Sequence, residues 1–447
     1  MLLSGFPLFF HKNPVFCIIC VERRDFMDDT IIIRGGNRLE GVIDLQGSKN
    51  SSLPILAATV LVDGISVIHN CPELSDVGAA IKILEHLGCK VKREGNDLTV
   101  DSRFVNACSI PDSLMREMRS SIVFLGSVLG RTGQARLSSP GGCEIGLRPI
   151  DLHISSLRAM GVSVDESRGC ISCKKEKTHK DTVISLTFPS VGATENIILA
   201  AALGKGRTVI LNAAREPEIK DLADFLCGCG CKVELTGHGT VTVDAVERAH
   251  GTVHRVIPDR IAALTYLSAV AVTGGDVLIK NTDTSHYQTV LPFFERAGCD
   301  ITDSVDRVRI KMNRRPLALR DIRTMPYPGF PTDAQATMMA TACVARGTSV
   351  IVENIFEGRF KHVGELVRMG AKIKLEGKVA IVDGVEALYG TRVACPDLRG
   401  GAALVVAGLC AKGVTQIGTL SHIDRGYEKL EQCLKNIGAD IERCKGK

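Results

Sequence analysis

The sequence contains no tryptophan, and aromatic residues make up only 4% of its 447 residues. A nucleic-acid surface that stacks bases on aromatic side chains is therefore not expected. The formal net charge of +5 is small, and no block of like charges is long enough to form a basic arm for nucleic acid. These observations do not exclude local anion-binding sites.

A secretory signal and a bilayer-spanning segment are also missing. The apolar stretch MLLSGFPLFFHKNPVFCIICVERRDF lacks a basic leading region and an A-x-A site, and His11, Lys12 and Asn13 interrupt it. Its uncharged runs are too short to cross a bilayer. We therefore expect no membrane partner. We interpret residues 1–26 as a disordered extension or as sequence upstream of the true start, with the folded protein beginning near Met27.

What the sequence does have is a sixfold repeat. An amphipathic helix that runs into a glycine and a short strand recurs in segments such as ILEHLGCKV and ELVRMGAKI. The glycine suits the left-handed end of a helix, and the alternating residues after it indicate a hairpin. The repeat glycines are spaced about seventy residues apart: Gly88, Gly161, Gly230, Gly298, Gly370 and Gly438.

Each unit also contains an almost wholly apolar helix, as in SVGATENIILAAALG and DLRGGAALVVAGLC. A helix that is apolar all round must be buried. We therefore predict an α/β protein of two domains, each an inside-out barrel of three units with helices inside and sheets outside. Six units are too many for one core.

The repeat also argues against metal binding. The segment CGCGC, with Cys227, Cys229 and Cys231, looks like a thiolate cluster, but its central glycine is a repeat glycine, so we interpret these cysteines as core residues. The pairs Cys170/Cys173 and Cys17/Cys20 lack the second pair that a zinc site needs. We predict no metal and no cofactor. The 17 cysteines fit a reducing cytoplasm better than a disulfide framework.

Polar residues occupy equivalent positions at the start of the six buried helices. Such N-termini favour anions, and two triple units facing each other would direct six of them into one cleft. Taken alone, Ser190 or Asp333 is better explained as a cap of its own helix. The cations oppose the helix dipole and therefore indicate a strongly anionic substrate. The positions are Lys49 with Asn50, Arg119, Ser190, Arg260, Asp333 and Arg399.

The second unit is the longest because it contains an inserted loop, SPGGCEIGLRP. Its Cys143 follows two glycines in a segment poorly suited to a core. A glycine-rich loop near the cleft, with Arg148 five residues later, suggests a lid that carries a reactive thiol. The alternative is an incidental surface cysteine.

With these residues the sequence resembles the UDP-N-acetylglucosamine 1-carboxyvinyltransferases (enolpyruvyl-UDP-GlcNAc synthases) of the EPSP synthase-like superfamily. The resemblance runs from about residue 30 to the C-terminus, through the motifs GSKNSSLPIL, PGGCEIGLRPIDLH, SVGATENI, NAAREPEI, FPTDAQA, DLRGGAALV and HIDRGYEKLE. It implies the two-domain enolpyruvyl transferase fold. We place one domain at residues 27–48 plus 258–447 and the other, with the Cys143 loop, at 49–257.

The resemblance also implies the activity: transfer of the enolpyruvyl group of phosphoenolpyruvate to the 3′-hydroxyl of UDP-N-acetylglucosamine in peptidoglycan synthesis, by an enzyme that fosfomycin inhibits. Lys49 and Asn50 would meet phosphoenolpyruvate, and Arg148, Arg399 and Arg425 would hold its phosphate and carboxylate. Cys143 would donate a proton and Asp333 would be the base, completing the catalytic set with Lys49 and Arg425. The implied nucleotide-sugar contacts are Arg119, Arg148, Pro149, Ile150, Asp151, Leu152, Ser190, Val191, Gly192, Asp333 and Ile355.

One position departs from the family pattern, because Phe188 stands where some members have a lysine that reaches toward the nucleotide. Two rival functions fit the sequence less well. The shikimate-pathway enolpyruvyl transferases lack the PGGC loop and have a serine-rich motif where this chain has Asn50. An idle nucleotide-sugar-binding homologue would not need acid, base and phosphate-holding cations together.

Overall fold

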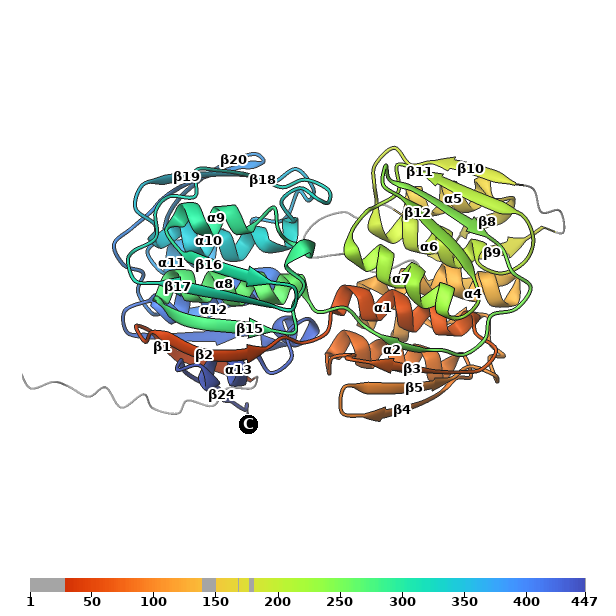
Figure 1. The fold of residues 1–447 in the computed structure, drawn as a ribbon, viewed down its shortest axis with the longest axis horizontal. Helices are drawn as coiled ribbons and strands as arrows, with labels where there is room; N and C mark the ends of the chain where they lie inside the picture. The colour runs from red at the N-terminus through yellow and green to blue at the C-terminus, as the bar shows by residue number, and fades with distance from the viewer. Residues whose placement is uncertain (1–28, 139–149, 168, 177–180, 447) are drawn as a thin grey trace, which may run out of the picture.

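The protein, described by a computed structural model over residues 29–138, 150–167, 169–176 and 181–446, forms two lobes that lie side by side (Figure 1). The terminal lobe has a hydrophobic core built from residues 31–45 and 261–441. The inserted lobe has a separate core built from residues 53–256. The chain crosses between the lobes twice, and the crossings pair with each other, since Ser48 N donates to Ile257 O at 2.8 Å.

Each lobe has three four-stranded sheets of one design among the described residues. The first two strands of each sheet are parallel, and the third and fourth follow antiparallel. In the inserted lobe the sheets are β14(Val253–Arg255)-β3(Ile65–His69)-β5(Asp97–Asp101)-β4(Lys90–Glu94), β6(Ser109–Ile110)-β7(Gln134–Ser138)-β9(Cys170–Lys175)-β8(Val162–Ser167) and β10(Thr182–Ser185)-β11(Arg207–Leu211)-β13(Thr240–Asp244)-β12(Lys232–Thr236). In the terminal lobe they are β2(Leu39–Asp44)-β15(Gly275–Lys280)-β17(Arg307–Met312)-β16(Asp300–Ser304), β18(Asp321–Arg323)-β19(Thr348–Val352)-β21(Val379–Asp383)-β20(Lys372–Glu376) and β22(Arg392–Ala394)-β23(Val414–Gly418)-β1(Thr30–Arg34)-β24(Asp440–Cys444).

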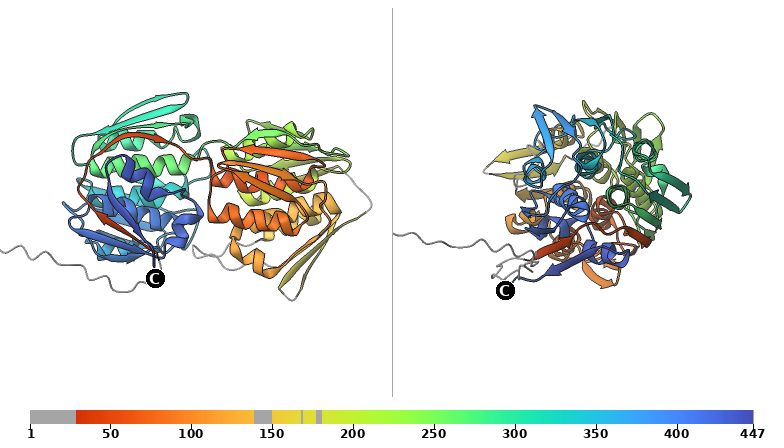
Figure 2. Two further views of the ribbon diagram at one scale, coloured as in Figure 1. Left: turned by 90° about the horizontal axis from the view of Figure 1, so that it is seen from below. Right: turned by 90° about the vertical axis from the view of Figure 1, so that its left-hand side faces the viewer.

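The apolar helices lie inside the lobes and the sheets lie outside, as the view along the long axis shows (Figure 2). Almost every side chain of these helices is buried, so they lack the polar face that a surface helix needs. The predicted inside-out arrangement is confirmed. The inner helices are α1(Lys49–Ala58) with η1(Thr59–Leu61), α4(Phe124–Thr132) after η2(Arg119–Val123), α6(Val191–Ala201), α8(Arg260–Thr273), α10(Gln335–Val344) after η4(Thr332–Ala334), and α12(Leu398–Cys410).

The second helix of each unit is amphipathic and ends at the repeat glycine. All six repeat glycines have φ between +76° and +103°, the left-handed conformation that the sequence predicts. These helices are α2(Ser75–His86), α5(Asp151–Ala159), α7(Pro217–Gly228), α9(Leu291–Ala297), α11(Val363–Arg368) and α13(Leu430–Asn436). Three short elements complete the description: α3(Asp112–Glu117), η3(Thr284–His286) and η5(Leu420–Arg425).

The cysteines of the CGCGC segment behave only partly as predicted. Cys229 and Cys231 are buried in the core of the inserted lobe, whereas Cys227 is exposed. Cys227 is the penultimate residue of α7 and lies on the outward side of that amphipathic helix, which explains the difference. Within the described ranges, no helix is long and apolar enough to cross a membrane, and no three side chains form a metal-ligand group.

Candidate active site

The cations that begin the inner helices are not the residues that cap them. The Ser48 hydroxyl caps α1 by accepting the N–H of Ser51 at 3.3 Å. Asp259 and Asp397 cap α8 and α12, and each carboxylate accepts two backbone N–H groups at 2.9 to 3.0 Å. Capping therefore does not occupy the side chains that follow one or two positions later: Lys49, Arg260 and Arg399.

Lys49 and Arg425, which come from different lobes, meet at one carboxylate. Nζ of Lys49 lies 2.8 Å from Oδ2 of Asp76, and Nε of Arg425 donates to Oδ1 of Asp76 at 2.9 Å. Asp76 lies in the first turn of α2 and is only 1% exposed. Burial lowers the pKa of Lys49, and the neighbouring Asp76 opposes that effect. The fold thus brings together two of the four residues predicted to be catalytic.

Asp333 is held by two arginines of the terminal lobe. Arg359 donates to one carboxylate oxygen through Nη2, and Arg399 donates to the other at 3.1 Å. Both arginines are 3% exposed. Asp333 is the second residue of η4, and Pro331, which precedes η4, makes no side-chain cap bond. The two guanidinium groups thus hold both oxygens of the Asp333 carboxylate.

Ser190, in contrast, is a cap. Its hydroxyl accepts the N–H of Ala193 at 3.3 Å and so begins α6. Behind this turn, Asn196 accepts the N–H of Gly126 at 2.6 Å and lies 2.8 Å from Nδ1 of His153. Burial lowers the pKa of His153 to about 4, so this ring is neutral at neutral pH. The network fixes the start of α6 against α4 and α5.

Arg260 joins the lobes rather than leaving an open anion site. Its Nε and Nη2 donate to the two carboxylate oxygens of Glu218 in α7, at 2.9 and 3.4 Å. Two more carboxyls lie nearby in the inserted lobe. Burial raises the pKa of Glu195 well above its ordinary value and also raises that of Glu216. The sequence pattern predicts that Arg260 binds a substrate anion, but in the structure its guanidinium is paired with Glu218.

Comparison with known proteins identifies the family of this chain. The family model described as EPSP synthase (3-phosphoshikimate 1-carboxyvinyltransferase) matches residues 33–434. A UDP-N-acetylglucosamine 1-carboxyvinyltransferase 2 from Caldanaerobacter subterraneus is 50% identical over 411 residues, which cover 92% of this chain and 98% of that protein. The UDP-N-acetylglucosamine 1-carboxyvinyltransferase of Geobacter metallireducens is 45% identical, with 93% and 100% covered. The chain belongs to the UDP-N-acetylglucosamine 1-carboxyvinyltransferase family.

Solved structures of more distant enolpyruvyl transferases have the same fold. The enolpyruvyl transferase NikO from Streptomyces tendae superposes with a TM-score of 0.85 at 22% identity, covering 94% of this chain and all of that one. An EPSP synthase from Acinetobacter baumannii gives a TM-score of 0.74 at 16% identity, with 94% and 100% covered. At such identities the likeness concerns the fold alone, and it confirms the predicted fold class.

The remaining residues predicted from the family pattern fall into two groups. Cys143, Arg148 and Pro149 lie outside the described residues, and of Arg119 only its backbone position at the start of η2 is described. The others lie at ordered element ends. Asn50 is in the first turn of α1, Ile150 precedes α5, Asp151 and Leu152 begin α5, Val191 and Gly192 begin α6, and the N–H of Ile355 donates to Glu353 at 2.8 Å.

The helix-start pattern did not reveal the residues that pair with the predicted ones: Asp76, Glu218 and Arg359. A signal existed for the first two, because α2, α5, α7, α11 and α13 all have an acidic residue in their first turn. Aligning the second helices of the repeat as well as the inner ones would have singled out these positions. Arg359 lies in a loop and has no such repeat signal.

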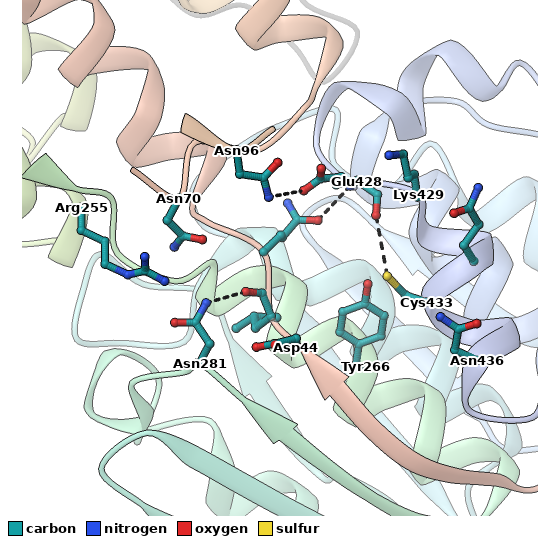
Figure 3. Close-up of a pocket in the computed structure, with 13 residues that line it drawn as sticks. Asp44, Asn70, Asn96, Arg255, Tyr266, Asn281, Glu428, Lys429, Cys433 and Asn436 are labelled. Atoms are coloured by element: carbon teal, nitrogen blue, oxygen red, sulfur yellow. Dashed lines mark hydrogen bonds between the residues drawn. The ribbon is translucent and has the colours of Figure 1, made fainter. Parts of the chain in front are cut away.

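A cavity of about 410 Å³ lies elsewhere, where the two crossings leave the terminal lobe (Figure 3). Asn70 and Asn281 line it, but each donates its amide to a backbone carbonyl of a crossing segment, at 2.9 and 2.7 Å. Asn212 and Asn354 make the same kind of bond at equivalent ends of β11 and β19. These asparagines therefore belong to the repeat framework.

Proposed function

We propose that the protein transfers the enolpyruvyl group of phosphoenolpyruvate to the 3′-hydroxyl of UDP-N-acetylglucosamine and releases phosphate, the first committed step of peptidoglycan synthesis. The observation that carries the proposal is the 44 to 50% identity, over nearly the whole chain, to proteins named UDP-N-acetylglucosamine 1-carboxyvinyltransferase. The arrangement of charges supports it, because Lys49 of the inserted lobe lies near Arg399 and Arg425 of the terminal lobe. Arg399 in turn donates to Asp333.

The reaction needs a base for the sugar hydroxyl. As the hydroxyl oxygen attacks carbon 2 of phosphoenolpyruvate, its proton must leave, and we assign Asp333 to accept it. Arg359 and Arg399 hold both carboxylate oxygens, so the side chain is oriented before the substrate arrives. A positioned base contributes roughly 10²- to 10⁴-fold to the rate.

The donor needs cations and an acid. We assign Lys49, Asn50, Arg148, Arg399 and Arg425 to the phosphate and carboxylate of phosphoenolpyruvate, because fixed cations stabilise the charge that develops on them. Cys143 is assigned to protonate carbon 3, which gives a tetrahedral phosphate-bearing intermediate. Loss of a proton from carbon 3 and of phosphate from carbon 2 then forms the enolpyruvyl ether.

The acceptor is assigned to the start of α6 and the neighbouring segments. Backbone N–H groups of a helix N-terminus suit the diphosphate, and cations suit its charge. The assigned contacts are Arg119, the run from Arg148 to Leu152, the run from Ser190 to Gly192, Asp333 and Ile355. We propose that the lobes act as domains with limits at residues 27–48 plus 258–447 and 49–257. The many free cysteines fit a cytoplasmic location.

A phosphate-release assay tests the proposal. Purified protein is incubated with phosphoenolpyruvate and either UDP-N-acetylglucosamine, shikimate 3-phosphate or no acceptor. Release that depends on the nucleotide sugar supports the proposed reaction. Release that depends on shikimate 3-phosphate would assign the protein to the other branch of the superfamily, and no release with either acceptor would refute catalysis.

A further inference from the structure

Asp76 occupies a special position between the lobes. It lies in the first turn of α2, where the helix dipole favours a carboxylate, and almost no solvent reaches it. One of its oxygens lies 2.8 Å from the ammonium of Lys49 in the same lobe, and the other accepts the Nε–H of Arg425 from the opposite lobe at 2.9 Å. A single carboxylate thus contacts two cations that are far apart in the sequence, one in α1 and one in η5.

Neither cation is fully occupied by this contact. A lysine ammonium has three N–H donors and an arginine guanidinium has five, whereas the described contacts with Asp76 are an ion pair to Lys49 and one hydrogen bond from Arg425. The side chain of Arg425 is 33% exposed and that of Lys49 is 11% exposed, whereas that of Asp76 is 1% exposed. The more exposed cations can therefore contact a ligand while Asp76 stays buried behind them.

We propose that Asp76 is a positioning residue for the anionic donor substrate: it ties Lys49 of one lobe to Arg425 of the other, so that the donor site is complete only when the lobes meet. This inference rests on the proposed function. Asp76 itself does not touch the reacting atoms. It acts by fixing where the two cations stand.

Asp76 also favours the charged form of Lys49. Burial lowers the pKa of Lys49, Asp76 raises it, and Arg399 and Arg425 lower it further. The other described carboxylates close to α1 do not offer the ammonium a substitute, because Asp259 binds the backbone N–H of Lys49 and Asp221 binds the hydroxyl of Ser51. Without the Asp76 charge, the ammonium would be buried beside two guanidinium groups. It would then lose its proton at a lower pH, and the donor site would lose one cation.

The test measures the KM for phosphoenolpyruvate, the KM for UDP-N-acetylglucosamine and kcat for the wild type, Asp76→Asn and Asp76→Glu, each from about pH 6 to about pH 8. We expect Asp76→Asn to raise the donor KM about tenfold or more at the upper pH, with the acceptor KM within about twofold of wild type. The ratio of variant to wild-type donor KM should fall as the pH falls, because Lys49 regains its proton. Asp76→Glu keeps the charge, so its donor KM should be raised without that pH dependence.

Glu218→Gln is the matched control. Glu218 is also a buried first-turn carboxylate that pairs with a cation of the other lobe, but its partner is Arg260. We expect this variant to show no acid-rescued donor KM. Equal changes in both KM values for Asp76→Asn, an unchanged donor KM, or the same pH rescue in Glu218→Gln would overturn the inference.

The controls separate the inference from protein folding and from the proposed function. Circular dichroism and the thermal midpoint show whether each variant folds. If Asp76→Asn does not fold, Asp76→Glu alone tests the inference, and a donor KM equal to that of the wild type would refute the positioning role. An inactive wild type would refute the proposed function. An active wild type with a normal donor KM in the Asp76 variants would refute only the inference.

Discussion

Replacing Asp333 by Asn separates the role of a base from that of a structural contact. The amide keeps the size and one acceptor oxygen of the carboxylate, but it cannot take a proton from a hydroxyl. The structure also makes the change more than the loss of a helix cap, because Asp333 faces Arg359 and Arg399, both buried. Two effects are therefore expected, one on turnover and one on stability.

The effect on turnover should be the larger one. Loss of a positioned base lowers kcat by at least about 100-fold, equivalent to about 2.7 kcal/mol in the activation free energy. The stability effect comes from two guanidinium groups that lose their anionic partner. Since the Asp333 side chain is 25% exposed, we expect a loss of about 1–3 kcal/mol in the free energy of unfolding. In a lobe of this size that lowers Tm by roughly 2–10 °C.

The assay combines phosphate release at saturating substrates with a thermal melt and calorimetric titration of UDP-N-acetylglucosamine. Glu353→Gln is the matched control: this buried carboxylate of the same lobe binds Thr324, Thr332 and the backbone of Ile355. It should lose stability while retaining most of kcat. If Asp333→Asn loses only stability and keeps its turnover, the assignment of Asp333 as the base is wrong.

Three further predictions concern closure, the loop thiol and acid stability. UDP-N-acetylglucosamine should reduce the radius of gyration in small-angle scattering, and an unchanged value would count against closure of the two lobes. Fosfomycin should alkylate Cys143, whereas Cys143→Asp should resist it and stay active with an optimum at lower pH; an inactive but folded Asp variant would show that sulfur is required. Burial lowers the pKa of His153 to about 4. Below about pH 6.5 the unfolded chain therefore binds a proton at this residue that the folded chain does not, so the folded state becomes less stable as the pH falls. Stability should fall by up to about 1.4 kcal/mol per pH unit between about pH 6.5 and 4, and His153→Gln should remove that slope; an unchanged slope would contradict a neutral buried ring.

Much of the architecture follows from local pattern. The repeat glycines end helices in the left-handed conformation, and the helices without a polar face are the inner ones, because both properties depend on residues close in sequence. The prediction that all three cysteines of CGCGC are core residues was wrong for Cys227, which faces outward from its helix although the other two cysteines are buried. Alignment of the repeat located Lys49, Asp333 and Arg399 at the helix starts without reference to any contact.

The sequence by itself determined the six units, the inner helices and the family motifs that name the candidate site. Only the tertiary structure decided which charges face each other: Asp76 joins Arg425, 349 positions away, and Arg260 joins Glu218 across the lobes. Such pairs have no local signature, because an ion pair depends on how two separately folded cores are placed against each other. The chain crosses between those cores twice, at Gly47 and Pro258, and the placement of the lobes at these crossings sets the charged contacts of the cleft.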